Sequence, residues 1–487
     1  MNGKNKFWLL VSLLVVFAMV LAACTSGATP TPEAAEATEA PVAVETEPPA
    51  AETEPPAAEQ PEAAACTTEL WTALPGGALE KAYNGELTGS VVTMMGPFTE
   101  GDIVKFEQSI KAFEEKTGID IQYEGTKEFE ATIGVRVDAG DVPDIVDFPQ
   151  PGLLANFFAQ GKFIDPTSFL PLEYLQQQYK QGWLDMGTMA GPDGQPATGG
   201  IWARYNGKSQ VWYPKDDFDA AGYAIPTTGE ELLALSDQIV SDGDTPWCVG
   251  IESGAATGWP ATDWMEEFML RTTSPENYDK WVKGELKFDS PEVRNALTKL
   301  SELWLKEGYV YGGQEAITTT FFGDAPAPMF EQPPKCWLHK QGNFITTFFP
   351  EGVKVGEDYD FFYLPGIDAQ YGSPYLVAGD IYAMWRDAPE VRAVLEYFSR
   401  GESLKEWLAA GGALAPQNDA CLDWYTDPVE KKIAGLVAEA STVRFDASDL
   451  MPGAVGAGSF WKGMTDYFSG AADMDTVLKE IDASWPK

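Results

Sequence analysis

Histidine and cysteine are scarce in this chain of 487 residues. It contains a single histidine, His339, and five cysteines, no two of which form a C-x-x-C pair. A structural zinc site usually takes four closely spaced Cys or His ligands, so the composition argues against a zinc protein. The sequence also lacks the G-x-S-x-G, H-E-x-x-H and P-loop motifs of common catalytic centres. We expect neither a metal nor a cofactor.

Basic residues are also few, with 33 Lys and Arg against 74 Asp and Glu, which gives a formal net charge of −41. Residues 25–65 contribute −9 and the first 24 residues +2, so the remainder carries −34. No run rich in Lys or Arg occurs. A surface this acidic repels a phosphate backbone, so the charge argues against a nucleic-acid partner and a polyanionic substrate.

Long apolar runs are absent except at residues 7–21, which follow Lys4 and Lys6 and precede small residues and Cys24. This order is typical of a secretory signal, and the run is shorter than the roughly 20 residues of a spanning helix. The stretch L-A-A-C resembles the bacterial lipobox, whose Cys becomes the lipid-carrying first residue. We therefore expect residues 1–24 to be a lipoprotein signal peptide and the mature protein to be membrane-anchored outside the cytoplasm. An ordinary signal peptide with an incidental Cys is the alternative.

Residues 25–65 consist almost wholly of Ala, Pro, Glu and Thr, with nine Glu and no Lys or Arg. Such a segment has too little apolar surface to offset its ordering entropy, and its prolines and like charges favour an extended chain. It is predicted to be a disordered tether, or a spacer whose length is not selected.

Residues from Cys66 onward are numerous enough for two domains. Alternating strand and helix patterns are predicted at 90–95, 102–116, 119–123, 129–137 and 143–148. This order predicts a parallel α/β sheet, in which ligands bind at loops beyond the carboxyl ends of strands. The loops at 96–98 and 149–152 lie at that place, which makes Phe98 and Gln150 candidate contacts.

Several stretches resemble one family of proteins. They are S-V-V-T-M-M-G-P-F-T-E (90–100), F-E-E-K-T-G-I-D-I-Q-Y-E-G (113–125), D-V-P-D-I-V-D-F-P-Q-P-G-L-L (141–154), G-K-F-I-D (161–165), V-W-Y-P-K (211–215), G-W-P-A-T-D-W (258–264), P-P-K-C-W-L-H-K-Q (333–341) and F-D-A-S-D-L-M-P-G (445–453). In this order they resemble the extracellular solute-binding proteins of bacterial ABC importers, in the carbohydrate-binding, α-glucoside-type branch related to maltose-binding protein.

The resemblance implies a two-lobed, periplasmic-binding-protein-like (type II) α/β fold that closes on a ligand. Each lobe would be a mixed sheet flanked by helices, with crossings near 206–211, 379–384 and 414–418. The first lobe would hold 66–205 plus 381–414, and the second 206–380 plus 415–487. Lipidation of Cys24 would leave four exported cysteines and hence two disulfides with three possible pairings. The resemblance implies Cys248 with Cys336, which leaves Cys66 for Cys421.

Sugar recognition needs aromatic planes for the apolar ring faces and polar side chains for the hydroxyls. Trp259 is expected to begin a helix at an exposed position, whereas Trp264 and Phe268, at helical spacing, are expected in the core. Residues 339, 341 and 343 alternate like one face of a strand. Asp263 follows Trp259 in the same stretch, and Arg204, Tyr205 and Asp380 lie at or beside the predicted crossings. The fold analogy also favours Asp446, which flanks a turn. The full set of predicted contacts is Phe98, Gln150, Arg204, Tyr205, Trp259, Asp263, His339, Gln341, Asp380 and Asp446.

Each candidate has a simpler interpretation: a core Trp, a surface Arg, a structural His or a solvated carboxylate. The function implied is a monomeric receptor that captures a sugar or oligosaccharide and delivers it to an ABC permease without chemistry. A secreted glycoside hydrolase, a receptor for another solute and a surface adhesin are the alternatives. We expect Trp259→Ala and Asp446→Ala to weaken binding while leaving the melting temperature of the empty protein almost unchanged.

Overall fold

The computed structural model describes residues 68–486, so the signal, the tether, Cys24 and Cys66 lie outside the described residues. The first predicted strands and helices are confirmed. They are β1 (Val91–Gly96), α2 (Glu100–Thr117), β2 (Asp120–Gly125), α3 (Phe129–Ala139) and β3 (Ile145–Phe148).

Local sequence accounts for the position of α2. Thr99 stands at the N-cap, and acidic residues in the first turn complement the helix dipole. Gly118 ends the helix in the left-handed conformation with φ 70°, which glycine adopts without strain. Phe106, Ile110 and Phe113 lie on its buried face, so α2 packs on the sheet through one apolar stripe.

The larger sheet has six strands. Its order is β11-β10-β3-β1-β2, and β6 also pairs with β10. β1 is parallel to β2 and β3, as predicted, whereas β10 is antiparallel to β3 and β6. The added strands are β6 (Ile201–Gly207), β10 (Pro374–Met384) and β11 (Thr442–Phe445). The sheet is therefore mixed.

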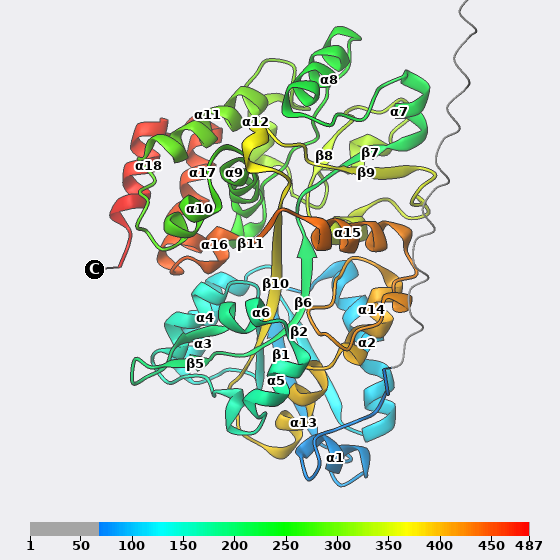
Figure 1. Ribbon diagram of the computed structural model, residues 1–487, viewed down its shortest axis with the longest axis vertical. Coiled ribbons are helices and arrows are strands. Elements are labelled where there is room, and N and C mark those ends of the chain that lie inside the picture. Colours follow the sequence, from blue (N-terminus) through cyan, green and yellow to red (C-terminus); the bar gives the residue numbers. More distant parts are fainter. Residues whose placement is uncertain (1–67, 487) are drawn as a thin grey trace, which may run out of the picture. The chain divides into compact units, whose positions relative to one another are not determined.

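Helices cover β1, β2, β3 and the adjoining parts of β6 and β10 to form the first lobe, in the lower half of Figure 1, whereas β11 pairs with the start of β10 toward the second lobe. Val92, Met94, Ile145 and Ile381 are fully buried in its core. Besides α2 and α3 the lobe contains α1 (Ala78–Tyr83), α4 (Pro151–Phe158), α5 (Leu172–Gln178), α6 (Gln181–Met186), α13 (Pro389–Phe398), α14 (Lys405–Ala410) and the hairpin β4 (Thr188–Ala190) and β5 (Pro196–Thr198).

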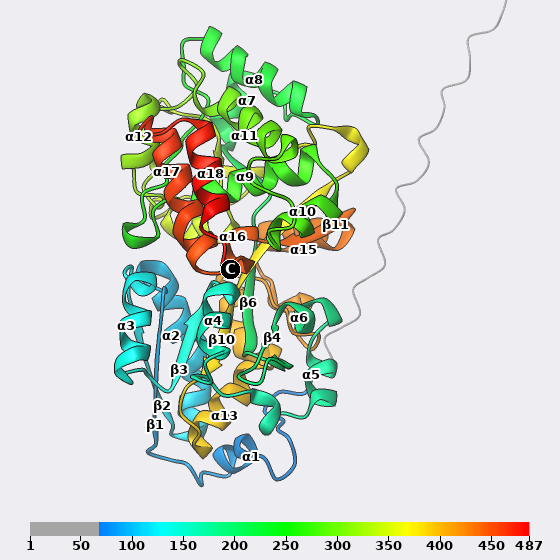
Figure 2. The ribbon, with the colours of Figure 1, turned by 90° about the vertical axis from the view of Figure 1, so that its left-hand side faces the viewer.

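The second lobe is built around an antiparallel sheet of order β8-β7-β9. Its strands are β7 (Gln210–Pro214), β8 (His339–Lys340) and β9 (Tyr359–Tyr363). Its helices are α7 (Lys215–Ala221), α8 (Gly229–Ser241), α9 (Trp259–Thr272), α10 (Pro275–Val282), α11 (Pro291–Trp304), α12 (Gly313–Thr319), α15 (Pro428–Glu439), α16 (Ala447–Leu450), α17 (Trp461–Ser469) and α18 (Met474–Ala483). Trp264 and Phe268 lie in its core, as predicted. Figure 2 shows α8, α9, α11, α17 and α18 together in this lobe.

The antiparallel pair β6 and β10 joins the two lobes, and both figures show these strands running between them. The strands approach very closely at Gly379, where a Cβ atom would lie 2.6 Å from the carbonyl oxygen of Arg204. Only glycine fits there, and Arg204 and Asp380 are direct partners in the ladder. Residues from both strands therefore form one continuous surface at the junction.

Residues 417–419, at the end of the predicted third crossing, lie against residues of the first lobe. Gln417 Nε2 donates to Ala203 O at 2.9 Å, Asn418 N to Gln178 O at 2.6 Å, and Gly401 N to Asp419 Oδ1 at 2.8 Å. The boundary between the lobes in this part of the chain stays a prediction. No described helix combines the length and apolar character needed to cross a membrane.

Candidate functional site

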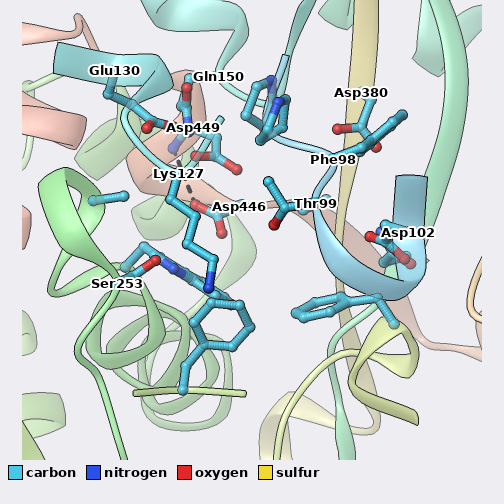
Figure 3. Close-up of a pocket in the computed structure, with 18 of the residues that line it drawn as sticks. Phe98, Thr99, Asp102, Lys127, Glu130, Gln150, Ser253, Asp380, Asp446 and Asp449 are labelled. Atoms are coloured by element: carbon cyan, nitrogen blue, oxygen red, sulfur yellow. Dashed lines mark hydrogen bonds between the residues drawn. The ribbon is translucent and has the colours of Figure 1, made fainter. Parts of the chain in front are cut away.

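A cavity of about 190 Å³ lies where the two lobes meet, and residues of both line it (Figure 3). The loops after β1 and β3 contribute from the first lobe, as expected for strand ends. The start of α9 and the 3₁₀ segment Asn343–Phe348 contribute from the second lobe. The cavity therefore sits at the crossing strands.

Three polar residues of the first crossing form the floor. Arg204, Asn206 and Lys208 alternate along the chain, so their side chains emerge on one face, and all three line the cavity. Tyr205 points to the opposite face, where it packs on Trp183 with ring centroids 5.0 Å apart and lines a different hollow. The prediction of Tyr205 as a cavity contact is wrong because strand neighbours face opposite ways.

Arg204 joins two buried carboxylates at one end of the cavity. Its Nε donates to Asp380 Oδ2 at 2.8 Å and its Nη2 to Asp102 Oδ2 at 3.1 Å. The guanidinium also lies 4.3 Å from the ring centroid of Phe98. Burial raises the pKa of the Asp380 carboxyl, although Arg204 opposes the rise. Asp380 is thus buried and paired, and the interpretation as a solvated carboxylate is wrong.

Lys208 holds a second pair of carboxylates. Its ammonium donates to Asp263 Oδ1 and to Asp446 Oδ2, both at 2.7 Å. Burial alone would raise the pKa of Asp446, but the charge of Lys208 and its other hydrogen bonds lower it below its usual value. Burial raises the pKa of Asp263 to about 7 against the same attraction. Lys208 therefore favours the ionised form of Asp446.

Asp446 is also a structural residue. Its Oδ1 accepts from Ser448 Oγ at 2.8 Å and from Asp449 N at 3.0 Å, which caps α16. With 1% of its surface exposed, it has many contacts in the empty protein. The premise that Asp446 has few contacts in the empty protein is therefore wrong, and we now expect Asp446→Ala to lower the melting temperature.

Aromatic side chains form another part of the cavity wall, beside the floor residue Lys208. Trp259, half-buried at the first position of α9, lies 4.9 Å from Phe322 and 5.9 Å from Phe344 between ring centroids. Phe322 and Phe348 are 5.2 Å apart. Gly258 precedes the helix with φ 112°, and a Cβ there would lie 2.2 Å from Trp461 O, so this turn requires glycine. As predicted, Trp259 begins its helix, and its ring lines the cavity.

Four buried atoms of the lining residues have no hydrogen-bond partner within the described chain. They are Asp102 Oδ1, Gln150 Oε1, Arg204 Nη1 and Asn206 Oδ1. An unpaired buried polar atom costs about 1–3 kcal/mol, so such groups in a cavity wall are suited to a ligand that pairs with them. Three are acceptors and one is a donor, which matches a solute rich in hydroxyl groups.

Three further predicted contacts do not line the cavity. Asp263 lies one helical turn beyond Trp259 and is covered by Lys208. Gln341 is buried with its Oε1 bonded to Gly342 N at 2.9 Å. His339 Nδ1 lies 2.9 Å from Cys248 O, and burial lowers its pKa to about 4. The predicted strand face 339–343 is also wrong, because β8 ends at Lys340 and a 3₁₀ segment begins at Asn343.

The remaining six, Phe98, Gln150, Arg204, Trp259, Asp380 and Asp446, do line it. Sequence reasoning missed Asp102, Asn206, Lys208 and Asp449, whose burial depends on distant segments; Lys208 and Asp446 are 238 residues apart. The one available signal was the alternation of polar residues at 204, 206 and 208 along a predicted crossing.

Among the described residues, one set of three carboxylates has oxygens close enough together to hold a cation. Oxygens of Asp263, Glu266 and Asp446 lie within 4.8 Å of one another. The ammonium of Lys208 already contacts two of the three, so it occupies the position of a cation there.

The Cys248–Cys336 disulfide is confirmed. Cys421 is buried, and Thr68, two residues after Cys66, donates through Oγ1 to Asp419 O at 2.7 Å. Because Cys66 lies outside the described residues, its pairing with Cys421 stays a prediction.

Two lobes joined by crossing strands, with unpaired polar atoms and aromatic rings turned into the space where they meet, define a solute receptor. Comparison with known proteins gives the same class: the chain belongs to the bacterial extracellular solute-binding protein family, whose model matches residues 100–409. This family is extracytoplasmic and binds solutes.

Three proteins illustrate the likeness. The osmoprotective compounds-binding protein GgtB of Synechocystis is 43% identical, over 83% of this chain and 94% of its own length. The alpha-glucosides-binding periplasmic protein AglE of Rhizobium meliloti is 40% identical, over 84% and 90%. The solved structure of the bacterial solute receptor AcbH shares the fold at 19% identity, with a TM-score of 0.70 over 81% of this chain and 98% of that one.

Proposed function

We propose that this chain is the substrate-binding lipoprotein of an ABC importer, and that it captures a neutral sugar or short oligosaccharide, α-glucoside-like, between its lobes. A membrane permease receives the ligand, and the receptor does no chemistry on it. The observation that carries the proposal is the pairing of the aromatic wall at Trp259 with the unpartnered polar atoms on the floor. A pyranose offers apolar faces to the first and hydroxyls to the second.

The relatives support this ligand class. AglE is named for binding alpha-glucosides and GgtB for binding osmoprotective compounds, and both match this chain over more than four fifths of its length. The cavity volume of about 190 Å³ is small beside the roughly 300–1,000 Å³ of common ligand pockets, which favours a short sugar.

The anchoring is part of the proposal. Cys24 is the lipidated residue, residues 25–65 are the tether, and the head acts as a monomer at the membrane surface. The proposed lobes comprise 66–205 plus 381–414 and 206–380 plus 415–487. Cys24→Ser releases the protein from membranes into the soluble exported fraction on this account. Fractionation that finds the variant still on membranes contradicts the lipid anchor.

A ligand screen tests the function. Melting of the purified protein is followed with maltose, trehalose, sucrose and galactose, and with amino acids and small anions for comparison. A ligand that binds only the folded state raises the melting temperature by mass action. Stabilisation by a neutral sugar, with the sugar recovered intact, supports the proposal. Stabilisation only by an amino acid or anion contradicts the sugar assignment, and cleavage of the sugar contradicts the receptor role.

A further inference from the structure

One end of the cavity is formed by three residues from separate elements. Glu130 is in α3, Gln150 precedes α4, and Asp449 is in α16 of the other lobe. Figure 3 shows all three on one side of the cavity, away from Asp102 and Asp380. We call them the acceptor end.

Close packing brings α4 and α16 together there. A Cβ atom at Gly152 would lie 1.9 Å from Met451 O, so no side chain fits between the start of α4 and the end of α16. Gln150 and Asp449 are consequently held near each other across the two lobes.

The atoms that the acceptor end offers to a ligand are oxygens. Gln150 is 5% exposed, and its Nε2 donates to Glu130 Oε1 at 3.1 Å, which leaves Oε1 unpartnered. Asp449 is 7% exposed, and among the described residues its carboxylate makes no hydrogen bond. An amide oxygen and two carboxyl groups thus converge, and the amide nitrogen among them is already turned to Glu130.

The neighbouring cations are already engaged. The ammonium of Lys208 is shared by Asp263 and Asp446. That of Lys127 pairs with Glu100 at 2.5 Å and lies 4.2 Å from the ring centroid of Phe321. Among the described residues, neither ammonium forms an ion pair with Glu130 or Asp449.

We propose that the acceptor end is a subsite that admits only hydroxyl donors of an uncharged ligand and excludes ligands with a carboxylate there. This inference rests on the proposed function. A hydroxyl can donate to Gln150 Oε1 and to Asp449, whereas a ligand carboxylate offers no donor and would be buried there without a cation as its partner. Burial already raises the pKa of both Glu130 and Asp449, which shows how poorly this place accommodates negative charge.

The test compares ligands that differ by one group. Calorimetric titrations use maltose, maltitol, maltobionate (maltitol with a terminal CH₂OH replaced by a carboxylate) and α-D-glucuronosyl-(1→4)-glucose (maltose with the non-reducing CH₂OH replaced). The proteins are the wild type, Glu130→Gln/Asp449→Asn and a matched control, Asp138→Asn/Glu439→Gln. The control removes the same charges from exposed positions on α3 and α15. Melting curves confirm that each variant is folded.

In the wild type and the control, at least one carboxylate ligand is expected to bind ten or more times more weakly than its neutral counterpart. In Glu130→Gln/Asp449→Asn, the ratio of the dissociation constant of that carboxylate ligand to that of its neutral counterpart is expected to fall to threefold or less. If both carboxylate ligands bind the wild type as well as the neutral ones, or if the ratio survives the double substitution, the subsite is contradicted while the receptor role stands. If neither neutral sugar binds the folded wild type, the capture of α-glucosides is contradicted and the subsite with it.

Discussion

At the scale of single residues, two cations organise the cavity floor, and each is shared by two carboxylates. Arg204 joins Asp102 and Asp380, and Lys208 joins Asp263 and Asp446. Ion pairs buried this deeply are costly to break, because removal of one partner leaves an uncompensated charge out of water. The charges of the floor are therefore already paired with one another in the empty protein.

Asp446→Ala is expected to lower the free energy of unfolding of the empty protein by about 3–5 kcal/mol. The substitution leaves Lys208 with one partner and removes the cap of α16. Denaturant unfolding measures the loss. Asp219→Ala is the matched control, since Lys215 and Asp219 are also 2.7 Å apart but lie near the surface. Equal effects of the two substitutions would contradict the structural role of Asp446.

His339 is expected to make the free energy of unfolding depend on pH. Its pKa is about 4 in the folded protein against an ordinary value of 6.5, because burial disfavours the charged ring. The unfolded chain takes up this proton first as the pH falls, so the contribution is complete above pH 6.5 and is lost toward pH 4. The full loss is about 3 kcal/mol.

The measurement is denaturant unfolding of the wild type and His339→Asn from pH 7.5 to 5. The variant is expected to be less stable at pH 7.5, and the difference between the two proteins is expected to shrink as the pH falls. A difference independent of pH would mean that the imidazole is not buried in its neutral form.

At the scale of elements, the succession of strands and helices over residues 90–148 could be predicted from the sequence, because hydrophobic periodicity is a local property of the chain. The β1–β3 segment was predicted from alternating and helical spacing, and its loops contribute Phe98 and Gln150 to the cavity. The same local patterns could not predict that His339 and Asp263 lie outside the cavity. Their surroundings come from β7, Cys248 and Lys208, which are distant in sequence, so only packing decides which residues face the cavity.

The close contact of α4 with the end of α16 can be tested by adding a single methyl group at Gly152. Gly152→Ala places a Cβ 1.9 Å from Met451 O and is expected to destabilise the protein by about 1–3 kcal/mol and to weaken maltose binding. Gly134→Ala in α3 is the control, because its Cβ would meet only Phe157 Cζ at 3.9 Å. It is expected to stabilise the helix by about 0.5–1 kcal/mol with binding unchanged. Denaturant unfolding and maltose titration of both variants are the measurements. If Gly152→Ala is as stable as the wild type and binds maltose equally well, the close packing is contradicted.

At the scale of the whole molecule, the cavity exists only because residues far apart in the chain meet at β6 and β10. The resemblance to solute-binding proteins predicted this two-lobed arrangement, since composition and periodicity alone do not define where a chain crosses between lobes. The acidic surface and the scarcity of His and Cys excluded other classes of protein without identifying a ligand.

The central claim is that the cavity binds a neutral sugar through Trp259 and the polar floor and leaves it unchanged. Calorimetric titration of the wild type and Trp259→Ala with maltose, followed by chromatography of the recovered sugar, tests it most directly. The account predicts one site, intact maltose, and binding weakened by about 2–3 kcal/mol, or roughly 30- to 150-fold, when the ring is removed. Release of glucose, or equal binding by the two proteins, would contradict it.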